Sequence, residues 1–127
     1  MKRNAEYYLS RGFDPAAAAY FAGGRRKILS VTANPDFTLT LGFDNGEIRV
    51  YDAKPLLQPG TVFAPFARYE NFSRVYLDED HCVAWDIDPA ADSGRVWSNK
   101  VDLSPDTCYL ESVPAGDGFP LSYTRER

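Results

Sequence analysis

The feature that most constrains the fold is an alternation of apolar and polar residues over positions 37–51, interrupted by Asn45-Gly46. Its apolar members are Phe37, Leu39, Leu41, Phe43, Ile48 and Val50. A period of two is typical of strands with one buried face, and Asn-Gly between such runs favours a two-residue type I′ turn in which both residues take positive φ. We therefore predict a β-hairpin with Phe43 opposite Ile48 and Leu41 opposite Val50, on one apolar face.

The rest of the chain predicts further short elements. β-Branched and apolar residues indicate a strand over 28–33, and a second hairpin pairs 74–77 with 82–87 around the polar loop 78–81. Capping residues and prolines predict helices over 4–10, 15–22, 66–70 and 105–110. The predicted fold class is α+β, with a small, mostly antiparallel sheet of about five strands and short helices, preceded by a helical N-terminal extension.

A length of 127 residues suits one domain with one continuous core. We expect a helical N-terminal extension over 1–24 and a single α+β domain over 25–113. The segment 114–127 mixes proline, glycine and charge without a period, which predicts a flexible tail.

Composition excludes several protein classes. Apolar residues make up 44% and charged residues 25% of the chain, which is typical of a globular protein and not of a disordered or membrane chain. The sequence contains no membrane-span-length apolar run and no secretory leader pattern at its start, so we expect a cytoplasmic protein without a membrane partner. Cys82 and Cys108 are then expected to be reduced thiols.

The net charge of −4 is unevenly distributed. Residues 1–27 contain six basic and two acidic side chains, a net +4, so the remainder carries −8. An acidic body repels phosphate backbones, which disfavours nucleic acid as a partner. The basic segment, with Arg25, Arg26 and Lys27, either docks on its own acidic body, is solvated, or contacts an anionic partner.

An aspartate-rich stretch from Trp85 to Asp106 raises the question of a metal site. Asp86, Asp88 and Asp92 match three positions of a calcium loop, but Trp97 stands where such a loop needs glutamate. Another oxygen cage could use Asp86, Asp88 and Asp92 together with Asn99 or Asp102. The alternative, which we favour, is that these residues form turns through side-chain hydrogen bonds to the backbone, so that no metal is held.

The sequence singles out no catalytic residue and no cofactor site. His81 and Cys82 are neighbours on a predicted strand end and point to opposite faces, so His81 is badly placed to activate Cys82. A pair of His81 with Cys108 lacks a third, orienting residue at a recognisable spacing.

Aromatic and basic residues suggest a surface for binding a protein. Trp85 occupies an alternating strand position and is expected in the core, whereas Trp97 lies in the polar stretch and is expected to be exposed. We assign Arg49, Tyr51 and Trp97 to an interaction surface. An exposed sheet edge could also join two copies as a homodimer.

Two longer stretches carry a family resemblance. The segments DFTLTLGFDNGEIRVYDAKPLL and VFAPFARYENFSRVYLDEDHCVAWDIDP resemble bacterial proteins of the uncharacterised DUF2442 family, over about residues 25–112. The resemblance implies a small α+β fold like the N-terminal domain of a putative nitrogen-assimilation regulator. It also implies a bacterial setting in which some relatives carry a helix-turn-helix domain or neighbour toxin and antitoxin genes. It supplies no catalytic residues.

Three functional hypotheses follow. The first is a non-catalytic protein-interaction or regulatory module with an unknown protein partner. The second is a divalent-cation-dependent binding site or enzyme centred on Asp86, Asp88 and Asp92. The third is a regulator associated with transcription or with a toxin–antitoxin pair.

Overall fold

A computed structural model describes residues 3–115 of the chain. Its helices are α1 (Ala5–Ser10), α2 (Pro15–Gly23), α3 (Tyr69–Phe72) and α4 (Pro105–Leu110), and 3-10 turns cover Lys54–Leu56, Ala64–Ala67 and Trp97–Asn99. The strands are β1 (Ile28–Ala33), β2 (Thr38–Phe43), β3 (Ile48–Asp52), β4 (Tyr76–Leu77), β5 (Val83–Asp86), β6 (Lys100–Leu103) and β7 (Val113–Pro114). The α+β prediction, including the N-terminal helical part, is confirmed.

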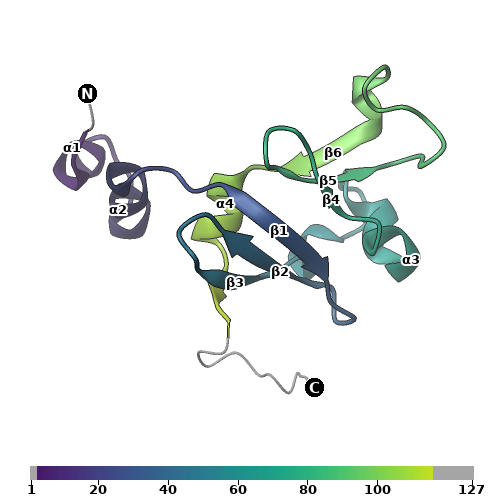
Figure 1. Ribbon diagram of the computed structural model, residues 1–127, viewed down its shortest axis with the longest axis horizontal. Coiled ribbons are helices and arrows are strands. Elements are labelled where there is room, and N and C mark those ends of the chain that lie inside the picture. Colours follow the sequence, from purple (N-terminus) through teal and green to yellow (C-terminus); the bar gives the residue numbers. More distant parts are fainter. Residues whose placement is uncertain (1–2, 116–127) are drawn as a thin grey trace.

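The strands divide between two antiparallel sheets (Figure 1). Sheet A has the order β1-β2-β3-β7, and sheet B has the order β4-β5-β6. The predicted helices over 4–10, 15–22 and 105–110 and the strand over 28–33 are confirmed. The helix predicted over 66–70 is broken, because Arg68 adopts extended backbone between a 3-10 turn and α3.

The hairpin at Asn45-Gly46 exists, but the predicted register is wrong. Ile48 lies opposite Gly42, and Leu41 lies opposite Arg49. Phe43 N–H donates to the Glu47 carbonyl (2.9 Å) and Gly46 N–H donates to the Phe43 carbonyl (3.0 Å), which closes a loop of three residues. Gly46 takes positive φ whereas Asn45 does not, so the turn is the three-residue kind with a glycine in the left-handed region. This register turns Ile48 to the outer face of sheet A, where it is 51% exposed.

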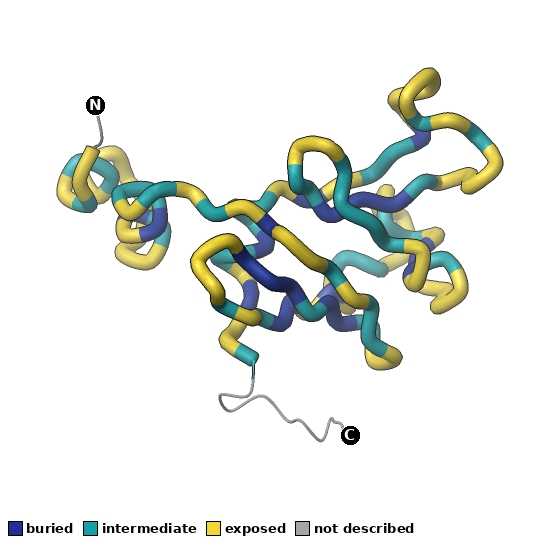
Figure 2. The backbone as a smooth tube through the Cα atoms, in the orientation of Figure 1, coloured by how far each residue is buried: buried dark blue, intermediate teal, exposed yellow. Residues whose placement is uncertain are grey.

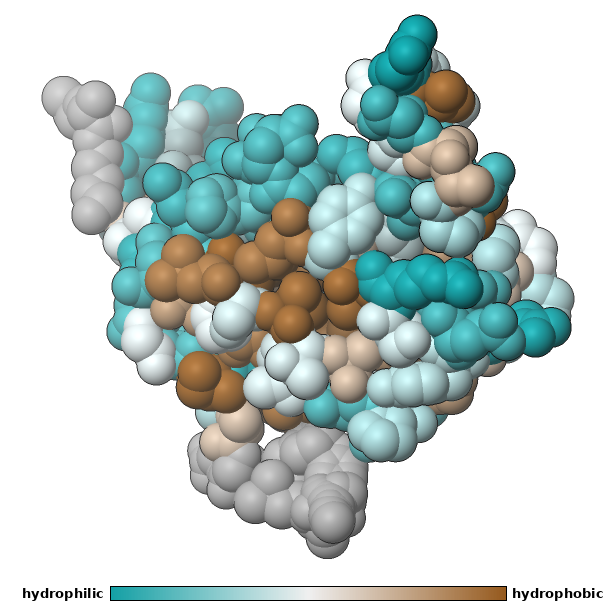
Figure 3. Space-filling model, turned by 45° about the vertical axis from the view of Figure 1, so that its right-hand side comes forward, coloured by the Kyte–Doolittle hydropathy of each residue, from teal (hydrophilic) through white to brown (hydrophobic). Residues whose placement is uncertain are grey.

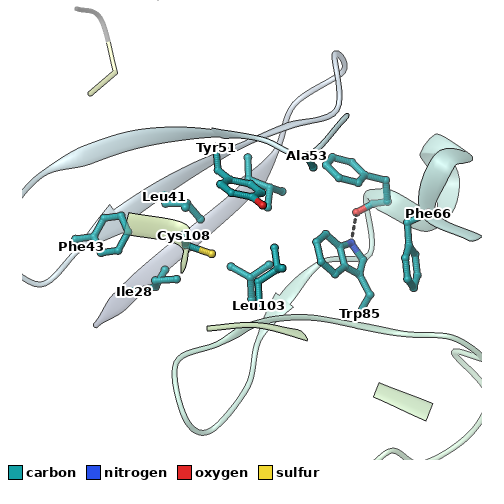
Figure 4. Close-up of a cluster of buried hydrophobic side chains, with 12 residues drawn as sticks. Ile28, Leu41, Phe43, Tyr51, Ala53, Phe66, Trp85, Leu103 and Cys108 are labelled. Carbon is teal, nitrogen blue, oxygen red and sulfur yellow. Dashed lines mark hydrogen bonds between the residues drawn. The ribbon is translucent and has the colours of Figure 1, made fainter. Parts of the chain in front are cut away.

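The core lies between the two sheets (Figure 4). Leu39, Leu41 and Phe43 of sheet A share it with residues of sheet B and α4. Trp85 of β5 is 1% exposed, stacks on Phe66 with ring centroids 5.4 Å apart, and donates its indole N–H to the Phe72 carbonyl (2.9 Å). The core position predicted for Trp85 is therefore confirmed, and its one polar atom is satisfied.

The N-terminal helices form an arm that extends beyond sheet A and is mostly exposed (Figure 2). Asn4 and Asp14 cap α1 and α2 by accepting hydrogen bonds from the backbone N–H groups of Tyr7 and Ala17. The arm is attached where the Tyr20 ring stacks on Tyr109 of α4, with ring centroids 5.0 Å apart. These contacts hold α2, whereas α1 has no buried residue.

Asp106 fastens the start of the domain to α4. Its carboxylate accepts a hydrogen bond from the Tyr20 hydroxyl (2.6 Å) and pairs with Arg25 (2.5 Å). Arg26 lies 3.8 Å from Asp44 and donates to the Gly24 carbonyl. Two of the three consecutive basic residues thus bind the chain's own groups, which agrees with docking of the basic segment on the acidic body.

The last described strand overlaps the start of the predicted tail by one residue. Pro114 and Val113 form β7 against Arg49 and Val50 of β3, so the ordered domain continues past 113. Residues 116–127 of the predicted tail lie outside the described residues. None of the helices within residues 3–115 is long and apolar enough to cross a membrane.

Candidate functional site

The loop between β5 and β6 holds the aspartates that the sequence singled out. Asp86 ends β5, and its Oδ1 accepts hydrogen bonds from the hydroxyl groups of Tyr76 and Ser93, both at 2.7 Å. Asp88 accepts from the Ala90 N–H (2.9 Å), and Asp92 accepts from the Gly94 N–H (2.9 Å). Asp88 and Asp92 therefore each stabilise a turn of the loop, as the turn interpretation expects, whereas Asp86 binds the hydroxyl groups of β4 and of the loop.

Asn99 organises this loop. Its side-chain oxygen accepts a hydrogen bond from the Asp88 N–H (2.9 Å), and its amide donates to the Asp88 carbonyl (3.0 Å) and to Ser93 Oγ (2.9 Å). Asn99 is only 8% exposed, although it stands in a polar stretch. From the sequence, Asn99 is expected only as a cation ligand, and the one signal of its structural role is its position directly before a strand.

The three aspartates do not converge on one point. Among residues 3–115, the only His, Cys, Asp or Glu side chains found as a group of three with ligand atoms within 4.8 Å of one another are Asp78, Cys82 and Asp102. The cage of Asp86, Asp88 and Asp92 would need the loop to rearrange, and their turn hydrogen bonds would have to break first.

The group of Asp78, Cys82 and Asp102 is arranged as an internal network. Asp78 Oδ1 accepts hydrogen bonds from the N–H groups of Asp80 and Cys82, and its Oδ2 pairs with Lys100 Nζ at 2.8 Å. Burial and the nearby carboxylates of Asp78 and Asp102 raise the pKa of the Cys82 thiol to about 11. A neutral thiol is a poor metal ligand, and the Lys100 ammonium already compensates the Asp78 charge.

Neither cysteine has the properties of a nucleophile. Cys108 is fully buried in the core, and burial raises the pKa of its thiol to about 12. His81 takes positive φ, and its Nδ1 lies 3.0 Å from the Ile28 carbonyl oxygen. The thiols are thus protonated at neutral pH, while the imidazole binds the start of β1.

An apolar groove opens where the loop returns to the sheet. Its volume is about 380 Å³, and it is lined by Val62, Phe63, Ile87, Trp97, Ser98, Lys100, Val101 and Asp102. We call this feature the Trp97 groove. Trp97 is 85% exposed, and Val62 is 66% exposed, so the groove presents large apolar side chains to solvent.

The residues assigned to an interaction surface do not lie together. Trp97 is at the surface, as expected, but Tyr51 is 3% exposed and belongs to the core. Arg49 is largely buried, because its guanidinium donates to Ser112 Oγ and to the Ser112 carbonyl, both at 2.7 Å, and lies over the Tyr109 ring. Arg49 therefore fastens the end of α4 to β3, and Trp97 remains as the exposed member of the set.

Exposed apolar surface also occurs outside the groove. The face of the molecule in Figure 3 carries a band of hydrophobic residues bordered by hydrophilic ones. Leu29, Ile48 and Val113 of sheet A are each about half exposed, at 59%, 51% and 46%. This surface is part of an open sheet, whereas the Trp97 groove is a shallow, open depression that lies beside an edge strand.

Comparison with known proteins identifies a family but no function. The family model described as "Protein of unknown function (DUF2442)" matches residues 28–114, which include both sheets. The chain belongs to the DUF2442 family. The DUF2442 match begins after the arm of α1 and α2, so the arm lies outside the part that the family shares. No curated protein and no solved structure matched the chain, and the likeness to a nitrogen-assimilation regulator domain stays a prediction.

Proposed function

We propose that this DUF2442 protein is a non-catalytic protein-interaction or regulatory module that binds a polypeptide through the Trp97 groove. The observation that carries the proposal is the 85% exposure of Trp97 beside an apolar groove. Leaving a tryptophan in water forgoes much hydrophobic stabilisation, and tryptophan in a concave site is the residue that most often dominates a protein interface.

The state of the thiols and carboxylates supports a non-catalytic role. Both thiols are protonated at neutral pH, and the aspartates of the loop each bind backbone or hydroxyl donors of their own turns. A catalytic site requires a group held ready for a substrate. These groups are already engaged within the fold, which supports binding as the function.

The proposal includes a cytoplasmic location, in keeping with two free thiols and a bacterial setting. A polypeptide partner is favoured over nucleic acid, because the net charge is −4 and two of the basic residues at 25–27 bind internal groups. A regulatory role beside transcription or toxin and antitoxin factors would be exerted through such a protein partner.

The test is affinity capture with the tagged full-length chain, compared with Trp97→Ala. Leu29→Ala is the matched control, because Leu29 is an exposed apolar residue of sheet A. We expect a captured protein that is lost with Trp97→Ala and kept with Leu29→Ala. The captured protein, purified alone, should bind the wild type on the order of tenfold more tightly than Trp97→Ala. Capture of the same protein by the wild type and by Trp97→Ala would overturn the proposal. Turnover of a defined substrate by the pure chain would also overturn it.

A further inference from the structure

The strand beside the Trp97 groove has an open edge. β6 is the outer strand of sheet B, in the order β4-β5-β6, and three of its residues, Lys100, Val101 and Asp102, line the groove. An unpaired strand edge is a template for pairing with another strand, and four residues of β6 are long enough to form a short ladder.

The hydrogen bonds define which residues face that edge. Ile87 N–H donates to the Asn99 carbonyl (2.7 Å), so Asn99, Val101 and Leu103 direct their backbone polar groups toward β5. In an antiparallel ladder the direction alternates from residue to residue, so Lys100 and Asp102 direct theirs away from the sheet. The Lys100 N–H also lies outside the ladder and is bonded to the Trp97 carbonyl, so the groups that the edge offers to a second strand are the Lys100 carbonyl and the N–H and carbonyl of Asp102.

The side chains at these two positions carry opposite charges. If a second β6 pairs antiparallel about a twofold axis at Val101, Lys100 of one copy lies opposite Asp102 of the other, and the same pair occurs twice. An axis at Lys100 or at Asp102 would place two like charges opposite each other, which is destabilising. Lys100 already pairs with Asp78, but an ammonium has three donors and can bind a second carboxylate.

The same register uses the apolar side of the strand. Val101 of each copy meets its counterpart across the axis, on the face that carries Leu103 and the groove. Apolar contact and charge pairing therefore select one arrangement together. The exposed position of Asp102 leaves its carboxylate accessible to a second chain.

From this combination we propose that the occupant of the Trp97 groove is a second copy of this chain, joined β6 to β6 in a symmetric antiparallel pair. The inference rests on the proposed function, because it names the polypeptide that the groove binds. A closed isologous pair covers both open edges at once and extends sheet B into one continuous sheet across the two copies.

The first test is sedimentation equilibrium of the full-length wild type over a wide range of concentrations. We expect a reversible dimer of twice the 14.2 kDa chain mass. Asp102→Lys places two lysines opposite each other twice and should raise the dimer dissociation constant on the order of tenfold or more. Asp52→Lys makes the same charge change on sheet A and should leave the dissociation constant unchanged.

A cross-link tests the register without depending on Asp102. Val101→Cys, in a Cys82→Ser background, should form a disulfide-linked dimer under mild oxidation, because a non-hydrogen-bonded antiparallel pair brings the two Cα atoms within disulfide reach. Leu29→Cys in the same background should form no disulfide-linked dimer, because Leu29 lies in β1, away from the proposed interface.

A wild type that is monomeric at every concentration, or a dimer that Asp102→Lys leaves intact and Val101→Cys does not cross-link, would overturn the β6 pairing. If a different protein is then captured through Trp97, the proposed function stands and only its partner changes. If neither a dimer nor Trp97-dependent capture is found, both proposals fall.

Discussion

Trp85 and Trp97 lie at the two ends of one loop and have opposite environments. Trp85 is 1% exposed, stacks on Phe66 and donates its indole N–H to the Phe72 carbonyl. Trp97 is 85% exposed in a 3-10 turn that the buried Asn99 holds in place. The first tryptophan stabilises the fold, whereas the second leaves its apolar surface in solvent.

Two residues of the same type thus have different roles, and their burial, not their apolar character, distinguishes them. Trp85 follows the alternation of β5 and points into the core with Val83. Trp97 precedes β6 in a segment whose polar side chains fix the loop around it. The hydrogen bonds of Asn99 thus hold the loop that carries Trp97. Binding through Trp97 would therefore not require the ordering of a disordered segment.

The largest expected difference between the two regions is in the free energy of unfolding after each tryptophan is replaced by alanine. Trp85→Ala should lower the free energy of unfolding by about 3–5 kcal/mol, because it leaves a large cavity and an unpaired Phe72 carbonyl. Trp97→Ala should change it by about 0.5 kcal/mol or less, because the side chain is already in water. Urea denaturation of both variants measures the difference, and equal losses would refute the division.

Asn99→Ala tests whether the hydrogen bonds of Asn99 hold the loop that carries Trp97 in its conformation. The change removes three hydrogen bonds of the buried Asn99 side chain, to the Asp88 backbone and to Ser93 Oγ, and should lower the free energy of unfolding by about 1–3 kcal/mol. Hydrogen exchange should accelerate in residues 87–99, while the core strands around Trp85 keep their order of protection. Asn71→Ala is the control and should cost less, because Asn71 is only partly buried and its amide bonds the Pro65 carbonyl at an exposed position. Unchanged exchange in the loop would contradict the role of Asn99.

A fall in pH should weaken the ion pair of Asp78 with Lys100 of β6 before it disturbs the packing around Trp85. Burial would raise the pKa of the Asp78 carboxyl, but hydrogen bonds from Lys100 and from the N–H groups of Cys82 and Asp80 outweigh it, so its pKa lies below the usual value. A lowered folded-state pKa gives stability that is present above the unfolded pKa and is lost as the pH falls through the folded pKa.

Asp78→Asn should therefore lower the free energy of unfolding at neutral pH by about 1 kcal/mol and flatten its decline in acid. Denaturation of wild type and variant at neutral and acidic pH measures both effects. A variant that keeps the acid sensitivity of the wild type would show that other carboxylates carry it.

Cations should have the smallest effect. Calorimetry with millimolar calcium or magnesium should give no binding heat, because Asp88 and Asp92 bind backbone N–H groups of separate turns and Asp86 binds the hydroxyl groups of Tyr76 and Ser93. A saturable heat that disappears with Asp88→Asn would instead support a cation site in the loop between β5 and β6. That loop would then bind a cation as well as a polypeptide.

Much of the fold could be predicted because its signals are local. The caps at Asn4, Asp14 and Ser104 and the alternation over 37–51 depend on neighbouring residues and appear in the structure. The register of the first hairpin could not be predicted, because Asn-Gly suits both two-residue and three-residue loops and the choice depends on packing of Phe43 in the core.

The site was less predictable because it depends on long-range contacts. The exposure of Trp97 could be expected from its polar neighbours, but the burial of Arg49 and Tyr51 depends on α4 and Ser112, more than fifty residues away. β6 and β7 were missed because their short runs have little alternation, and their pairing partners create them.

Fluorine NMR of the full-length chain labelled with fluorotryptophan tests the central claim most directly, because the protein has two tryptophans and needs no substitution. We predict that the Trp97 signal responds fully to exchange of H₂O for D₂O in dilute protein and shifts as the groove is occupied, by a second copy or by a captured partner. The Trp85 signal should stay unchanged throughout. A Trp97 signal that remains at its dilute, solvent-exposed position at every concentration and with every captured partner would contradict the account.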